Sequence, residues 1–113
     1  MNNKSIFELI LEGEINSDII YENGYVFAIN DINPVAKVHI LIIPKKKIES
    51  INFIEEEDTK YLAQMFLTAK LLAKKNEIND SGYRLVVNTN ENAGQTVFHI
   101  HMHLIGGEKL KNI

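Results

Sequence analysis

The stretch TVFHIHMHLIGG, residues 96–107, places His99, His101 and His103 at every second position, with bulky apolar residues between them. Period-two alternation is typical of a β-strand, because successive side chains point to opposite faces of a sheet. We therefore predict a strand over residues 96–105 with the three imidazoles on one face. The other face should pack against a helix through its apolar residues, Phe98, Ile100, Met102 and Leu104.

The composition is that of an ordinary soluble globular protein. At 113 residues, the chain is long enough for one domain with a substantial core, and we expect a single domain over residues 1–113. The formal net charge of -3 does not favour binding to nucleic acid or to an anionic membrane surface. The chain has no cysteine, which excludes disulfides and thiolate metal sites. Neither a signal peptide nor an apolar run long enough to span a membrane is present, so we expect a cytoplasmic protein.

The segments around this stretch predict an α+β fold. Ser5 and Glu8 have the spacing of a capping box, which favours a short helix through Leu11. Asn23 and Gly24 are turn residues between two apolar runs, as in a β-hairpin. The remaining pattern predicts strands over 19–23, 25–30, 37–44 and 83–88, and a long helix over about 56–76 with Leu62, Met65, Phe66, Ala69 and Leu72 on one face. The expected architecture is a five-stranded antiparallel sheet with one short N-terminal helix and one long helix.

Three imidazoles on one strand face allow three interpretations. They can form a solvated or internally hydrogen-bonded strip, although three in register make a poor core because every ring nitrogen needs a partner. They can bind zinc together with His39, although no acidic ligand accompanies HIHMH in the sequence. They can also provide a nucleophile that attacks phosphorus, with neighbouring histidines keeping it neutral and donating hydrogen bonds to phosphate oxygens.

The residues just before the histidines favour the third interpretation. Phosphate chemistry needs donors for the developing negative charge. In NAGQTV, Gly94 allows unusual backbone angles, Thr96 offers a hydroxyl, and the backbone N–H groups can form an anion-binding nest. A loop of this kind alone is an ordinary turn, but it directly precedes the three histidines. Lys45, Lys46 and Lys47 fit a solvated turn after Pro44 better than a phosphate site.

Five segments of the chain resemble the histidine-triad superfamily, and in particular its nucleoside phosphoramidase branch. The segments are IFELI, FAINDINP, VHILIIPKK, GYRLVVN and GQTVFHIHMHLIGG. They follow one another in the order and spacing of that branch. The resemblance implies the fold predicted above and hydrolysis of a purine nucleoside monophosphate linked to an amine or a similar leaving group.

The resemblance also implies a role for individual residues. His101 would attack the α-phosphorus and form a nucleotidyl-histidine, His103 would contact the α-phosphate or the departing group, and His99 would hold and polarise the site. His39 matches a fourth histidine beside the triad, and Asp31 matches an acidic residue that binds the ribose hydroxyls. The other implied nucleotide-binding residues are Ile32, Phe7 and Ile10 against the base, and Asn88, Gly94, Gln95, Thr96 and Val97 around the phosphate.

Simpler roles are open for several of these residues. Phe7 and Ile10 can be the inner face of the first helix, Asp31 can be a turn residue, and Asn88 can end a strand. Some bacterial members hold a structural zinc through two cysteines in the first helix, but Ser5 and Glu8 stand there in this chain. We therefore expect no required cofactor and no metal at the triad.

The expected partners are a purine nucleotide substrate and a second copy of the chain in a homodimer, with no nucleic acid or membrane. Three other functions stay open: a dinucleoside polyphosphate hydrolase of the same superfamily, a slow nucleotide-binding or scaffolding dimer, and a metal-binding module.

Overall fold

The computed structural model describes residues 3–113 and contains one five-stranded antiparallel sheet. The strands are β1 (Ile19–Glu22), β2 (Val26–Asn30), β3 (Val38–Pro44), β4 (Tyr83–Val86) and β5 (Met102–Gly106), in the order β1-β2-β3-β5-β4. The helices are α1 (Ile6–Leu11) and α2 (Thr59–Lys75), with short 3-10 turns at Ile51–Phe53, Glu56–Asp58 and Glu91–Ala93. The predicted architecture is confirmed, including the hairpin around Asn23 and Gly24.

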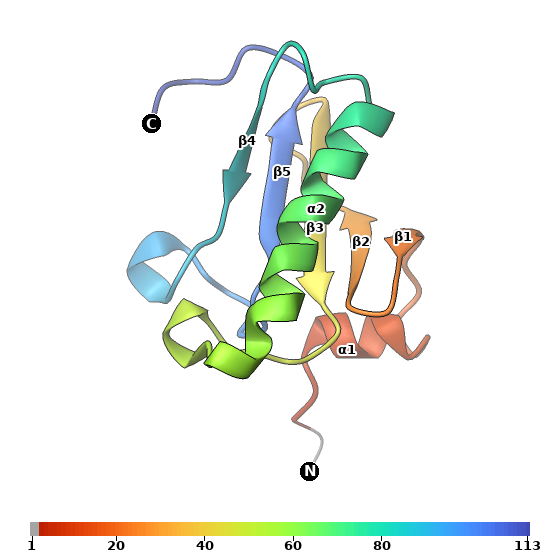
Figure 1. Ribbon diagram of the computed structural model, residues 1–113, viewed down its shortest axis with the longest axis vertical. Helices are drawn as coiled ribbons and strands as arrows, with labels where there is room; N and C mark the ends of the chain where they lie inside the picture. Colours follow the sequence, from red (N-terminus) through yellow and green to blue (C-terminus); the bar gives the residue numbers. More distant parts are fainter. Residues whose placement is uncertain (1–2) are drawn as a thin grey trace.

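The helix α2 covers one face of the sheet, where it lies across β3 and β5 (Figure 1). This face belongs to the larger hydrophobic cluster, formed by residues such as Val26, Ala28, Ile40, Ile42, Met65, Ala69, Leu72, Met102 and Leu104. The helix begins after a turn in which Asp58 Oδ2 accepts the N–H of Glu55 at 2.9 Å and Oδ1 pairs with Lys46 Nζ at 2.5 Å. Phe66 is 59% exposed, so its predicted place on the inner face of the helix is wrong.

The helix α1 packs on the opposite face of β2 and β3. Its buried residues Phe7 and Ile10 join a second cluster with Phe27, Ile29, Leu41 and Ile43. The predicted capping box is present, because the Ser5 hydroxyl accepts the N–H of Glu8 at 3.1 Å and the Glu8 carboxylate accepts the N–H of Ser5 at 2.9 Å. Because α1 is short, it leaves part of this face uncovered for the histidines.

The last strand is shorter than predicted, because it begins at Met102 and leaves His99 and His101 in the segment before it. The register pairs Ile42 with Met102, so continued pairing would place Ile100 opposite Pro44. Proline has no N–H to donate to a strand ladder. The chain instead bends at residues 97–99, and the N–H of Ile100 donates to the carbonyl of Ile48 at 2.6 Å.

This bend also changes the predicted packing of the stretch. Met102 and Leu104 lie in the α2 cluster as expected, and Ile100 is buried. Phe98 is 47% exposed, so its predicted packing against the helix is wrong. No helix within residues 3–113 is both long enough and apolar enough to cross a membrane.

Candidate active site

His101 presents one free ring nitrogen to the histidine face. Its Nδ1 lies 2.8 Å from the carbonyl oxygen of His99, and a carbonyl can only accept a hydrogen bond. The proton therefore lies on Nδ1, and the lone pair of the neutral ring lies on Nε2. Within residues 3–113, no hydrogen bond occupies that Nε2. A neutral imidazole held in this tautomer is a competent nucleophile.

The ring of His99 is buried and held at both nitrogens. Nε2 lies 2.8 Å from the carbonyl oxygen of Pro44, at the end of β3, and Nδ1 lies 2.7 Å from the hydroxyl of Ser5. The ring of Phe7 meets the rings of His99 and His101 edge-on, at centroid distances of 5.7 and 5.0 Å. His99 therefore holds the segment in place, and its own ring has no nitrogen left for a substrate.

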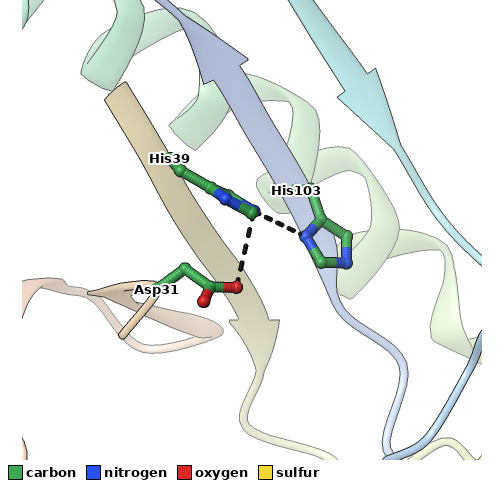
Figure 2. A group of neighbouring side chains, drawn as sticks. All are labelled: Asp31, His39 and His103. Atoms are coloured by element: carbon green, nitrogen blue, oxygen red, sulfur yellow. Dashed lines mark hydrogen bonds and ion pairs between the residues drawn. The ribbon is translucent and has the colours of Figure 1, made fainter. Parts of the chain in front are cut away.

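His103 and His39 face each other from adjacent antiparallel strands (Figure 2). His39 Nδ1 accepts the backbone N–H of Val35 at 3.1 Å, so its proton lies on Nε2. That Nε2 lies 2.9 Å from His103 Nδ1 and 3.4 Å from a carboxylate oxygen of Asp31. His103 Nδ1 is then the acceptor, and its own proton lies on Nε2. This chain of hydrogen bonds gives His103 a donor N–H beside the ring of His101, at a centroid distance of 5.2 Å.

Burial keeps the three triad imidazoles neutral. It lowers the pKa of His99 and that of His101 below the ordinary value of 6.5. It lowers the pKa of His103 to about 4, helped by the adjacent positive charge that His101 or His39 would carry when protonated. Desolvation disfavours an imidazolium because the ion loses its hydration. At neutral pH, the site therefore offers one lone pair on His101 and one N–H on His103.

Asp31, His39 and His103 each offer one metal-ligand atom, and these atoms lie within 4.8 Å of one another. The sequence around HIHMH contains no acidic ligand, but the fold brings Asp31 next to His39 and His103. However, a neutral histidine that binds a metal through Nε2 carries its proton on Nδ1. In His39, that proton would point at the N–H of Val35, which donates to Nδ1. The geometry therefore favours a hydrogen-bonded chain over a metal centre at these atoms.

An apolar cavity of about 210 Å³ lies beside the histidines. Its walls include four predicted nucleotide-binding residues, Phe7, Ile10, Asp31 and Ile32, together with Ile6, Ile15, Asn16, Ser17, Ile29, Asn30 and Leu41. Leu41 pairs with His103 across β3 and β5, so this wall adjoins the triad. The side chain of Ile32 is 89% exposed at the cavity. An apolar wall with a few polar groups is the usual form of a small-molecule pocket.

The predicted phosphate loop lies between β4 and the histidines. Gly94 adopts the left-handed conformation with φ +89°, which glycine adopts without steric cost, and ends the 3-10 turn at Glu91–Ala93. The Gln95 side chain is buried and stabilises the loop, because it accepts the N–H of Asn90 and donates to the carbonyls of Glu49 and Val97. Thr96 is exposed, whereas Asn88 and Val97 are half-buried. The side chain of Gln95 therefore shapes this loop from within.

Ser5 is one residue at this site whose contact with the triad sequence reasoning missed. The capping box identifies Ser5 as a helix cap, but it does not reveal that the hydroxyl contacts His99, which is 94 residues away. Ile29 and Leu41 in the cavity wall were missed as well, because they read as ordinary strand residues. Their place on the histidine face follows only once the register of β2 and β3 is known.

The chain is similar to known proteins over most of its length. The family model described as HIT domain matches residues 12–110. The chain is 44% identical to a purine nucleoside phosphoramidase from Escherichia coli K12, over 97% of this chain and 92% of that protein. It is 42% identical to an uncharacterized HIT-like protein from Buchnera aphidicola, over 97% and 98% of the two chains.

Solved structures show the same likeness. A HIT family hydrolase from Clostridium thermocellum superposes with a TM-score of 0.94 at 41% identity, covering 100% of this chain and 98% of that one. A HIT family hydrolase from Legionella pneumophila gives 0.92 at 42% identity, covering 96% of each chain. The resemblance seen in the sequence is thus confirmed: the chain belongs to the HIT domain family, the histidine-triad family indicated by the spacing of His99, His101 and His103.

Proposed function

We propose that this protein is a nucleotide hydrolase that cleaves purine nucleoside 5′-phosphoramidates, or related adenylates, through a covalent nucleotidyl-histidine on His101. The observation that carries the proposal is the hydrogen bond from His101 Nδ1 to the carbonyl of His99, which leaves Nε2 free as a nucleophile. The likeness to the purine nucleoside phosphoramidase of Escherichia coli supports the substrate class. The apolar cavity beside the triad supports a nucleoside as the bound group.

In the first step, His101 Nε2 attacks the α-phosphorus and the phosphorus–nitrogen bond breaks. The departing amine takes up a proton from solvent, and the nucleotide stays attached to His101. Water then attacks the same phosphorus, the bond to His101 breaks, and the nucleoside monophosphate leaves with release of one proton. The proton taken up in the first step is thereby returned in the second, so the two steps balance.

The other groups bind and stabilise rather than react. His103 Nε2–H donates to a phosphate oxygen, where a neutral donor supports the negative charge of the transition state. The backbone N–H groups of Thr96 and Val97, with the Thr96 hydroxyl and Asn88, complete the phosphate site. Gly94 and Gln95 shape its loop, because their own N–H groups donate to the carbonyls of Glu91 and Asn90. Phe7, Ile10 and Ile32 contact the purine, and Asp31 accepts hydrogen bonds from the ribose hydroxyls. No step in this route requires a metal or a cofactor.

The test is hydrolysis of adenosine 5′-phosphoramidate by the native protein in excess chelator, with AMP measured as product. We expect turnover to persist, because the reacting groups are all side chains and backbone. A parallel assay with a dinucleoside polyphosphate as substrate distinguishes a phosphoramidase from a dinucleoside polyphosphate hydrolase. Faster cleavage of that substrate, or activity that needs added divalent cation, would contradict the proposal. AMP binding without any turnover would leave a scaffolding or binding protein instead.

We also propose a homodimer built on the outer face of α2 and the edge strand β4. Phe66, Leu67 and Leu71 are about half exposed on α2, and Tyr83 begins β4 beside them. A cavity of about 320 Å³ lies between Leu67, Leu71 and Tyr83. Exposed apolar residues gathered on one face are typical of a protein–protein interface. Since β4 ends the sheet, a second copy can continue the surface across this edge.

A further inference from the structure

We infer that Ser5 is a positioning residue for the His101 nucleophile and that it acts through His99. This inference rests on the proposed function, because it concerns the same site. The hydroxyl of Ser5 accepts the N–H of Glu8 at 3.1 Å and lies 2.7 Å from His99 Nδ1. Since Glu8 already donates to the oxygen, the single hydroxyl proton is available for His99.

The opposite side of the His99 ring leads to the same assignment. Nε2 lies 2.8 Å from the carbonyl of Pro44, which can only accept, so Nε2 carries the proton. In a neutral ring, Nδ1 is then an acceptor, as the Ser5 hydroxyl requires. Two independent contacts therefore define one tautomer of His99 and hold its ring between α1 and the end of β3.

The backbone of His99 transmits this restraint to the nucleophile. Its carbonyl oxygen accepts the Nδ1–H of His101 at 2.8 Å, and this bond leaves the lone pair on His101 Nε2. The chain bends at residues 97–99 and has left the strand ladder there, so no β5 pairing holds this carbonyl. The ring of His99 is thus the anchor of the segment, and Ser5 holds one side of that anchor.

The same contact couples the nucleoside cavity to the nucleophile. Ser5 caps α1, and the buried Phe7 on α1 lines the cavity and contacts the rings of both His99 and His101. The Glu8 carboxylate completes the cap and lies 3.9 Å from Lys47 Nζ. The hydroxyl therefore has two roles, as a helix cap and as a donor to His99, and a test must separate them.

Three variants separate these roles. Ser5→Ala removes both the cap and the donor, whereas Ser5→Thr keeps a hydroxyl that can serve both. Ser5→Asp keeps a side-chain oxygen that can accept the N–H of Glu8 and cap the helix, but its carboxylate has no proton to donate to His99. Turnover of adenosine 5′-phosphoramidate is measured against pH, and the ring nitrogens of ¹⁵N-histidine-labelled protein are followed by NMR in the absence of substrate.

For Ser5→Ala we expect kcat to fall about 10-fold with little change in KM, as for the loss of one hydrogen bond. Without the donor, His99 Nδ1 can take up a proton, so the acid limb of the rate profile should move to higher pH. The groups that face His99 and set this titration are Glu8, which favours protonation, and His101 and Lys47, which oppose it. Ser5→Thr should restore the native rate, whereas Ser5→Asp should be at least as impaired as Ser5→Ala.

Native turnover in Ser5→Ala or in Ser5→Asp, or equal impairment in Ser5→Thr, would each overturn the inference. The NMR spectra decide it independently of catalysis. If the native protein hydrolyses no phosphoramidate, the proposed function fails, but the role of Ser5 is still read from His99. An Nε2–H tautomer and titration that are unchanged between the native protein and Ser5→Ala would then contradict the inference.

Discussion

His39 Nε2 donates to His103 Nδ1 across 2.9 Å, and the backbone N–H of Val35 fixes the direction of that bond by donating to His39 Nδ1. His103 therefore accepts at Nδ1 and carries its own proton on Nε2, the ring nitrogen that does not face His39. The backbone N–H of Val35, a residue outside the triad, therefore sets which nitrogen of His103 carries the proton. The fourth histidine is thus a part of the site even though it lies outside the triad.

Replacing His39 should lower turnover moderately. His39→Leu leaves His103 without its donor, so the N–H of His103 no longer has a defined position. We expect kcat to fall about 10-fold, as for one lost hydrogen bond, and to fall more, about 10²- to 10³-fold, in His103→Leu, which removes the donor itself. Steady-state kinetics of both variants check this. A His39→Leu rate equal to the native rate would show that the bond does not matter.

Ile32 offers a way to weaken nucleotide binding without disturbing the fold. The residue is 89% exposed and lines the apolar cavity beside the triad, so Ile32→Ser should change the free energy of unfolding by no more than about 0.5 kcal/mol. The affinity for AMP should fall, because the purine loses an apolar contact. Isothermal titration calorimetry with AMP measures the affinity, and urea unfolding measures the stability. Unchanged affinity would remove Ile32 from the nucleotide site.

The low pKa of His103 predicts a stability that depends on pH. Burial lowers the pKa of His103 in the folded protein to about 4, whereas the unfolded chain has the ordinary value of 6.5. Between these values the unfolded state binds more protons, so stability falls as pH falls through this window. The lowered pKa values of His99 and His101 act in the same direction. Urea unfolding of the native protein and of His103→Asn should show a shallower pH dependence in the variant; equal slopes would contradict the assignment.

If the proposed dimer forms through the outer face of α2, a charged residue on that face should dissociate it into monomers. Leu71 is 48% exposed, so Leu71→Glu should leave the fold intact and place a carboxylate in the interface. We expect sedimentation velocity to show a dimer for the native protein and a monomer for Leu71→Glu. Lys60→Glu, at an exposed position near the start of the same helix, is the matched control and should stay dimeric. A monomeric native protein would contradict the interface.

Local patterns in the sequence predicted most of the fold. The capping box at Ser5 and Glu8 and the turn at Asn23 and Gly24 depend on neighbouring residues, so they can be recognised without the structure. The late start of β5, at Met102, could not be predicted in the same way, because it depends on the register that would place Ile100 opposite Pro44. Phe66 was misplaced because periodicity alone does not distinguish a core residue from an exposed apolar one on the edge of a helical face.

The site was predicted as a set of residues rather than as a network. The spacing of His99, His101 and His103 predicted equivalent rings on one strand face, and it left a hydrogen-bonded strip, a zinc site and phosphate chemistry open. The structure makes them different: His99 is a buried anchor, His101 has the free nitrogen, and His103 is oriented by His39. These differences arise from contacts with Ser5, Pro44 and Val35, which lie far from the triad in the sequence.

The most direct test of the proposed mechanism is to trap the nucleotide on the protein. The native protein is mixed with adenosine 5′-phosphoramidate and the reaction is quenched within one turnover. The protein is then digested and its peptides are mapped by mass spectrometry, with His101→Gln as the comparison. We predict an adenylyl group on the peptide that contains His101, located on that residue, and no adduct in the variant, whose turnover should fall by about 10⁴-fold or more. Efficient native hydrolysis with no adduct, or a His101→Gln variant that keeps most of its rate, would contradict covalent catalysis by His101.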